Sequence, residues 1–280
     1  MTTKTLGAIA ATVTFALAGS AAADSITERL DAGEPIRIGF ANEIPWAYPG
    51  ENNEPLGFVN AYTLGLLNEM GIENIEPVVT DWGGLIPGLQ AGRYDMITGG
   101  MYILGTRCEN VNFSEPMGIF GDAFIVPTGN PQEIHNFEDL AENEDVTFVT
   151  GAGYNQVEFA LEAGVPDSRI MQVPGPTEIL AAVRAGRADA GGVTYFTALN
   201  LAEQSGGDVE VTDPSLMPEE TLYWVGIAFR PSDTDFLAMF NEAQEDYLGT
   251  EAMLAAVEEY GYTESQLPGD TTTEYACANR

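Results

Sequence analysis

Strand-like apolar runs alternate with helix-like runs along this chain, and the alternation occurs in two separate series. The first series consists of predicted strands and helices at 36–42, 58–71, 75–82, 84–92 and 94–99. The second consists of predicted strands and helices at 146–151, 155–164, 169–175, 176–186, 188–193 and 195–206. Strands that alternate with helices are typical of a parallel sheet covered by helices on both faces. The sequence therefore predicts an α/β protein with two doubly wound sheets.

Two extended runs lie at the junctions between these series. FGDAFIVPTGNPQEI (120–134) follows the first series, and ETLYWVGIAFRPSD (220–233) follows the second, before two amphipathic helices near 235–247 and 251–260. Two crossings of this kind favour a pair of lobes joined by a two-segment hinge, with a ligand cleft at the carboxyl ends of the strands. We expect residues 24–126 and 225–280 to form lobe 1, and residues 127–224 to form lobe 2.

The first 23 residues have the features of a secretory signal peptide. Lys4 precedes an apolar run from Leu6 to Ala18, and small residues then lead to an A-x-A site before Asp24. The run is too short to cross about 30 Å of hydrocarbon, which disfavours the alternative of a membrane anchor. We expect an exported, periplasmic protein that begins near Asp24.

The chain is strongly acidic. It has 43 Asp and Glu residues against ten Lys and Arg, and its formal net charge is −33. Nucleic acids and anionic lipids are bound through Lys and Arg, so neither is an expected partner. Adaptation to a saline habitat is one hypothesis for this composition, and a codon bias against lysine is another.

Residues for catalysis or metal binding are scarce. His135 is the only histidine, no nucleophile motif accompanies it, and the sequence contains neither a phosphate-binding loop nor a calcium loop. We expect no catalytic residue, no metal site and no cofactor. Cys108 and Cys277 are the only cysteines. In an oxidising compartment we expect them to form a disulfide, with two buried free thiols as the alternative.

Polar and aromatic residues follow the ends of the first three predicted strands. Glu43 and Trp46 follow the first strand, Trp82 follows the second, and Tyr102 and Arg107 follow the third. Aromatic faces attract cations, and a guanidinium group binds a carboxylate through two hydrogen bonds. The set favours a small zwitterion with a carboxylate and a flat or bulky cation. A surface ion pair for Arg107 and core positions for the aromatic residues are the alternatives.

Two glycine-containing segments can approach such a ligand closely. Gly99 and Gly100 end the third strand and carry no side chain. GAGYNQ (151–156) opens a predicted helix of the second series, where backbone N–H groups can hold a carboxylate.

Several segments carry a resemblance to a known family: ANEIPW, IPGLQAGRYDMITGG, Thr-Arg-Cys at 106–108, LEAGVPDSRI and the C-terminal Cys277. In these segments the chain resembles the solute-binding proteins of ABC importers, specifically those of the polar amino-acid-binding type. Such proteins have the two-lobed periplasmic class II fold. Within that type it is most similar to the ectoine/hydroxyectoine-binding proteins.

The resemblance implies roles for individual residues. Trp46, Trp82 and Tyr102 match an aromatic box for the ectoine ring, Arg107 matches a carboxylate clamp, and Glu43 matches an acid for the ring N–H groups. Gly100 lies beside this set.

Lobe 2 is expected to contribute Asn155 and Gln156, although ectoine binders tend to carry an acid at the second of these positions. Amino-acid binders carry an Asp near the position of Thr194, and its absence argues against an ordinary α-amino acid. Thr194 is counted with the ligand-binding residues.

These features predict a monomeric receptor that binds a small zwitterion, ectoine or hydroxyectoine, and delivers it to an ABC permease of the inner membrane. Another zwitterion, such as a betaine or an unusual amino acid, is the nearest alternative. A periplasmic dehydratase-like enzyme on the same fold, with Glu43 as its general acid, is a more distant one. A sensory domain would require a transmembrane or signalling segment, and none is recognised in the sequence.

Overall fold

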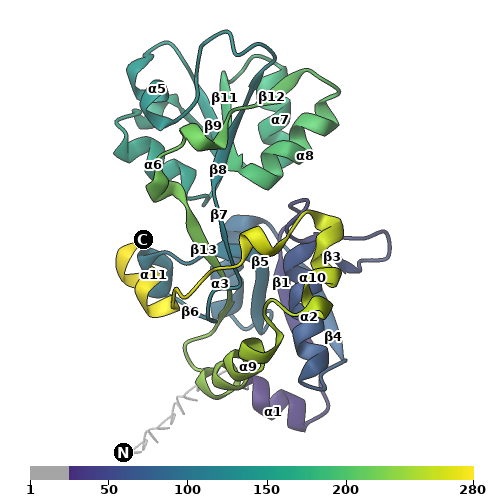
Figure 1. Ribbon diagram of the computed structural model, residues 1–280. Coiled ribbons are helices and arrows are strands. Elements are labelled where there is room, and N and C mark those ends of the chain that lie inside the picture. Colours follow the sequence, from purple (N-terminus) through teal and green to yellow (C-terminus); the bar gives the residue numbers. More distant parts are fainter. Residues whose placement is uncertain (1–24) are drawn as a thin grey trace, which may run out of the picture.

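The computed structural model describes residues 25–280, and the expected signal peptide at 1–23 lies outside this range. The described chain forms two α/β lobes, one above the other, joined by two extended segments (Figure 1). No helix within residues 25–280 is long and apolar enough to span a bilayer.

The helices are α1 (Ile26–Asp31), α2 (Phe58–Glu69), α3 (Leu85–Gln90), α4 (Gly105–Cys108), α5 (Phe137–Glu142), α6 (Gln156–Glu162), α7 (Pro176–Arg184), α8 (Tyr195–Ser205), α9 (Thr234–Tyr247), α10 (Glu251–Val257) and α11 (Thr273–Asn279). The strands are β1 (Ile36–Phe40), β2 (Tyr48–Pro49), β3 (Pro55–Leu56), β4 (Ile75–Val79), β5 (Met96–Tyr102), β6 (Asn112–Phe113), β7 (Gly118–Phe120), β8 (Asp122–Pro127), β9 (Phe148–Gly151), β10 (Ile170–Val173), β11 (Ala190–Thr194), β12 (Val209–Val211) and β13 (Tyr223–Phe229).

Each lobe is built on one sheet, and below "lobe 1" and "lobe 2" mean these sheets with their helices. Lobe 1 has the strand order β4-β1-β5-β13-β6, with β7 also paired to β13. Lobe 2 has the order β10-β9-β11-β8-β12. Helices α5 and α6 lie on one side of the lobe 2 sheet, and α7 and α8 lie on the other (Figure 1). Both faces of the lobe 2 sheet are thus covered, as the alternating sequence predicts.

Both sheets are mixed, whereas the alternation of strands and helices indicated parallel sheets. β4, β1 and β5 are parallel in lobe 1, but β13 runs antiparallel to β5. In lobe 2, β9, β10 and β11 are parallel, but β8 runs antiparallel to β11. The parallel strands end at the cleft. A strand that arrives from the other lobe begins at the cleft and must run the opposite way.

The two crossings lie side by side at the hinge. β7 pairs antiparallel with β13, with Phe120 opposite Tyr223 and Gly118 opposite Val225. One residue after β7, the chain enters β8 of lobe 2. The hinge is therefore a short two-stranded ladder, and backbone hydrogen bonds hold its two segments together.

The repeated phrase in the sequence has the same structure in both lobes. Gly92 and Gly186 end α3 and α7 with φ of 68° and 63°, a conformation that glycine adopts without strain. Three residues later, a carboxylate accepts a backbone N–H from the start of a neighbouring strand: Asp95 from Arg37, and Asp189 from Thr147. LQAGRYD and VRAGRAD thus join a helix to a strand in the same way.

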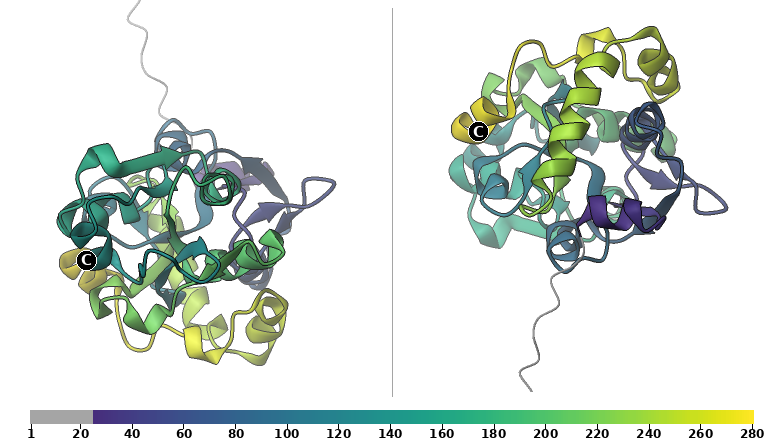
Figure 2. Two further views of the ribbon diagram at one scale, coloured as in Figure 1. Left: turned by 90° about the horizontal axis from the view of Figure 1, so that it is seen from above. Right: turned by 90° about the horizontal axis from the view of Figure 1, so that it is seen from below.

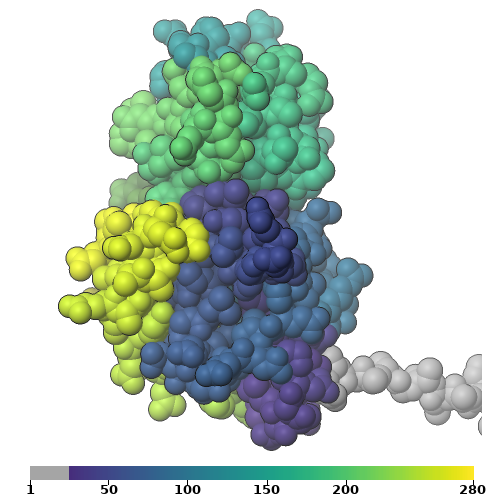
Figure 3. Space-filling model, turned by 90° about the vertical axis from the view of Figure 1, so that its right-hand side faces the viewer, coloured from purple at the N-terminus to yellow at the C-terminus, as the bar shows by residue number. Residues whose placement is uncertain are grey.

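The end of the chain returns to lobe 1. α9 crosses the lower face of this lobe near α1, as the view from below shows (Figure 2). α10 packs on α2, and α11, which the sequence did not predict, packs against α4. The space-filling view shows the two lobes in direct contact (Figure 3).

Candidate ligand-binding site

A cavity between the lobes brings together the residues that the sequence singled out. All nine expected ligand-binding residues line it: Glu43, Trp46, Trp82, Gly100, Tyr102, Arg107, Asn155, Gln156 and Thr194. Gly99 and Tyr154 complete the lining. Lobe 1 supplies most of the aromatic wall, and lobe 2 supplies most of the uncharged polar wall.

A tight loop after β1 sets the spacing of Glu43 and Trp46. Glu43 and Ala47 exchange two backbone hydrogen bonds, of 2.8 and 3.0 Å. The loop presents both side chains to the cavity, and both are buried. These two hydrogen bonds thereby fix the positions of Glu43 and Trp46 relative to each other.

Trp46 is both a core residue and a wall of the cavity. Its ring packs against Phe58 and Phe120, with ring centroids 4.7 and 4.6 Å away. A Cβ atom at Gly100 would clash with the Trp46 ring. Gly100 also has a φ of 79°, which disfavours other residues. This glycine is therefore required by the tryptophan, in addition to any approach of the backbone to a ligand.

Arg107 is buried without an acidic partner among the described residues. Its side chain comes from α4, the residue is 8% exposed, and no carboxylate in the described part of the chain lies within 4.0 Å of it. Its guanidinium donates to the carbonyls of Tyr102 (3.1 Å) and Gly153 (3.4 Å) and lies over the Trp82 ring at 5.7 Å. Burial lowers the pKa of Arg107 to about 10, and the nearby Tyr102, Glu158 and Asp122 oppose this shift. A buried, unpaired guanidinium beside a cavity is suited to an anionic group of a ligand.

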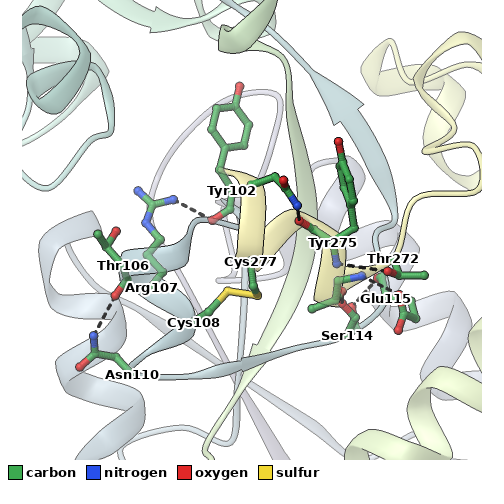
Figure 4. Close-up of a disulfide and its surroundings, with 12 residues drawn as sticks. Tyr102, Thr106, Arg107, Cys108, Asn110, Ser114, Glu115, Thr272, Tyr275 and Cys277 are labelled. Atoms are coloured by element: carbon green, nitrogen blue, oxygen red, sulfur yellow. Dashed lines mark hydrogen bonds between the residues drawn. A yellow bond between two sulfur atoms is a disulfide. The ribbon is translucent and has the colours of Figure 1, made fainter. Parts of the chain in front are cut away.

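The disulfide lies next to this arginine, and Figure 4 shows both. Cys108 in α4 is bonded to Cys277 in α11 across a sequence separation of 169, as the sequence predicted. The N–H of Gly105 also donates to the carbonyl of Arg280 at 2.7 Å. The C-terminal helix thus fastens the short helix that carries Arg107.

Glu43 is the buried acid that lines the cavity. Two lobe 2 hydroxyl groups donate to its carboxylate, Tyr154 at 2.7 Å and Thr197 at 3.0 Å. Burial raises the pKa of Glu43, while these two hydrogen bonds partly lower it. Sequence reasoning missed both partners. Tyr154 could have been found, because it stands beside Asn155 in the same loop, but nothing marked Thr197.

Gln156 presents an amide without a partner. The residue is 1% exposed and lines the cavity at the start of α6. Neither its amide oxygen nor its amide nitrogen has a hydrogen-bond partner within residues 25–280. Leaving a buried amide unpaired costs free energy, so a polar ligand group at this point would be favourable.

The lobes are closed over the cavity. Trp46 Nε1 donates to Thr194 Oγ1 at 2.8 Å, and Trp82 Nε1 donates to the carbonyl of Gly153 at 3.1 Å. Each bond joins lobe 1 to lobe 2, as do those of Glu43. These bonds hold the two lobes together beside the cavity.

The comparisons with known proteins agree with this geometry. The family of bacterial extracellular solute-binding proteins, family 3, matches residues 36–261. The chain belongs to this family.

Three proteins are similar to this family 3 protein over most of its length. A probable amino-acid ABC transporter periplasmic-binding protein, y4tE of Sinorhizobium fredii, is 33% identical over 98% of this chain and 93% of its own length. The crystal structure of EhuB in complex with hydroxyectoine has a TM-score of 0.83 and 28% identity, over 91% of this chain and 98% of that one. The ancestral amino acid-binding protein AncCDT-1, a precursor of cyclohexadienyl dehydratase, has a TM-score of 0.72 and 27% identity, over 84% and 99%. The class II fold and a solute-binding role within an amino-acid-type ABC transporter follow from these matches.

Outside the cavity the described residues offer little for other chemistry. His135 is partly exposed on lobe 2 and pairs with Asp139 at 3.2 Å. Residues 25–280 contain no group of three His, Cys, Asp or Glu side chains arranged to hold a metal ion.

Proposed function

We propose that this family 3 protein is a periplasmic receptor for ectoine or hydroxyectoine and delivers it to an ABC permease without catalysing a reaction. Arg107 is the observation that carries the proposal. It is a buried cation that lines the cavity and has no acidic partner among the described residues. A ligand carboxylate would supply the missing counter-charge.

The remaining walls of the cavity favour a ligand that also carries a delocalised cation. Trp46, Trp82 and Tyr102 present aromatic surface, which attracts a cation spread over a ring. Glu43 can accept ring N–H groups in the cavity, in place of one of the hydroxyl donors that it now has. The similarity to EhuB, which was crystallised with hydroxyectoine, supports the same ligand class.

Calorimetric titration with ectoine and hydroxyectoine tests this proposal. We expect saturable binding of at least one of them with one site per chain. Acetate and acetamidinium, which each carry only one of the two charged groups, are matched control ligands and should bind far more weakly. Absence of both heat and thermal stabilisation at millimolar ectoine and hydroxyectoine would refute the proposed ligand.

The same titration addresses the nearest alternative. Glycine betaine has the carboxylate and a bulky cation, but it has no N–H group for Glu43. Tighter binding of betaine than of either ectoine would assign the site to methylated zwitterions.

A further inference from the structure

Asp122 is a buried acid just behind the cavity wall. It is the first residue of β8, immediately after the hinge crossing, and it is 0% exposed. The hydroxyl of Tyr102 donates to its Oδ1 at 3.3 Å, and the amide of Asn155 donates to its Oδ2 at 3.4 Å. Within the described residues, no Lys, Arg or His lies within 4.0 Å of this carboxylate.

Both of its hydrogen-bond partners line the ligand cavity, and they come from different lobes. Tyr102 belongs to the aromatic wall of lobe 1, and Asn155 belongs to the polar wall of lobe 2. Asp122 is also directly opposite Thr194 in the ladder between β8 and β11. Thr194 accepts the hydrogen bond from Trp46. One carboxylate is thus connected to several walls of the site.

The protonation state of Asp122 changes how it can hold its two partners. An ionised carboxylate accepts a hydrogen bond on each oxygen, whereas a protonated one carries a hydroxyl on one of them. Protonation therefore replaces one acceptor by a donor, which faces either the Asn155 amide or the Tyr102 hydroxyl. Contact with the amide donor becomes unfavourable, and contact with the tyrosine requires its hydroxyl to turn.

The surroundings of Asp122 place its titration near neutral pH. Burial raises the pKa of Asp122 to about 7. Polar contacts with Gln156, Tyr102 and Asn155 lower it, and the charge of Glu43 raises it further. Gln156 is close to the carboxyl, although its amide makes no hydrogen bond of acceptable geometry there. Two other titratable groups, Arg107 and Tyr223, interact with Asp122 from lobe 1.

We propose that Asp122 is a positioning residue of the ligand site, which in its ionised form holds Tyr102 of lobe 1 and Asn155 of lobe 2 in the arrangement that binds ligand. Affinity is then greatest above pH 7. It falls by up to roughly tenfold per pH unit below that, because the ionised form becomes the minor species. Binding at pH 6 releases a proton from Asp122.

Titrations with ectoine or hydroxyectoine between pH 5.5 and 8.5 test this inference, which rests on the proposed function. Buffers of different ionisation enthalpy count the protons released. In Asp122→Asn we expect weaker binding at pH 8, no release of protons and a nearly flat pH profile. Asp246→Asn removes an exposed negative charge on α9 and should behave as the wild type does. Glu43→Gln should keep a pH dependence, because Asp122 is intact, but with its midpoint at lower pH, because the charge of Glu43 raises the pKa of Asp122.

The outcomes separate the two proposals. Wild-type binding at pH 8 supports the proposed ligand whatever the pH profile is. A pH profile that persists in Asp122→Asn but disappears in Glu43→Gln would overturn the role of Asp122 and leave the ligand assignment intact.

A second measurement needs no ligand. Near-ultraviolet circular dichroism reports the packing of aromatic side chains. It should change with a midpoint near pH 7 in the free wild type, and in neither Asp122→Asn nor Tyr102→Phe. If no such transition occurs in the wild type, Asp122 does not position the aromatic wall. This arm decides the inference even if neither ectoine binds.

Discussion

Arg107 and Arg230 are both buried in lobe 1, but their surroundings differ completely. Arg230 follows β13 and makes ion pairs with Asp233 at 2.8 Å and Asp95 at 3.3 Å. It also donates to the carbonyl of Tyr94 at 2.9 Å. Among the described residues, Arg107 hydrogen-bonds only to carbonyls and lies over the Trp82 ring. Acids of the protein thus pair with the buried cation of Arg230, whereas the buried cation of Arg107 can still pair with an acid from a ligand.

The pKa of Asp95, one of the acid partners of Arg230, shows the effect of this pairing. Burial would raise the pKa of Asp95, but hydrogen bonds from Arg37 and the charge of Arg230 bring it below its ordinary value. Burial still raises the pKa of Asp233 in spite of the charge of Arg230. Arg230 nevertheless has two acids within ion-pair distance, whereas Arg107 has none among the described residues. We therefore expect substitutions to affect folding at one arginine and binding at the other.

The largest expected effect concerns the disulfide that fastens the helix of Arg107. Replacing Cys108 and Cys277 by serine removes a cross-link spanning 169 residues. In the chain-entropy model this costs about 5 kcal/mol of unfolding free energy. Urea unfolding of the variant and the wild type measures the difference. Equal stability would show that the noncovalent contacts of α11 are sufficient.

Arg230→Met should have the next largest effect, on folding. It leaves Asp233 and part of the Asp95 cluster without a counter-charge, which typically costs about 3–5 kcal/mol for a buried pair. Urea unfolding is again the measurement, with the exposed Arg93→Met as the control. A variant as stable as the control would mean that Arg29 and Arg37 fully compensate at Asp95.

Arg107→Met should show the reverse pattern. Loss of a desolvated charge partner costs about 2–5 kcal/mol of ligand binding, or roughly 30- to 4000-fold in Kd. Stability should be unchanged or higher, because an unpaired buried charge is replaced by an apolar side chain. Calorimetry and urea unfolding of the same preparation check the two halves. Destabilisation as large as in Arg230→Met would remove the contrast between the two arginines.

Tyr154→Phe should have the smallest effect of the four. It removes one hydrogen bond to the Glu43 carboxylate across the lobes, worth about 1.5–3 kcal/mol if the acid stays ionised. We expect ligand to dissociate faster with little change in unfolding, as measured by stopped-flow and urea titration. A wild-type dissociation rate would indicate that the ligand displaces Tyr154 from Glu43.

Local sequence signals predicted most of the elements and many of the cavity residues. Helix stops such as Gly92 and Gly186 and the apolar runs placed the helices and strands, because these features act within a few residues. The residues after strand ends could be placed in one cleft, since parallel strands end at a common edge. Cys108 and Cys277 could be paired because no other cysteine exists.

The features that were missed depend on contacts distant in sequence. The reversed direction of β8 and β13 follows from which lobe each strand comes from, and no local pattern records this. Thr197 and Asp122 became part of the site through partners 154 and 20 residues away. α11 carries a weak helical pattern and is held by the disulfide and by α4.

The hydrogen bonds of the tryptophans give the protein a built-in optical signal. Trp46 and Trp82 each donate an indole N–H across the lobes, whereas Trp224 donates to the carbonyl of Pro268 within lobe 1. Separation of the lobes hydrates two of the three indoles in the chain and leaves the third unchanged. The emission spectrum should therefore shift to the red on opening, with Trp224 as an internal reference, and ligand uptake can be followed without any attached dye.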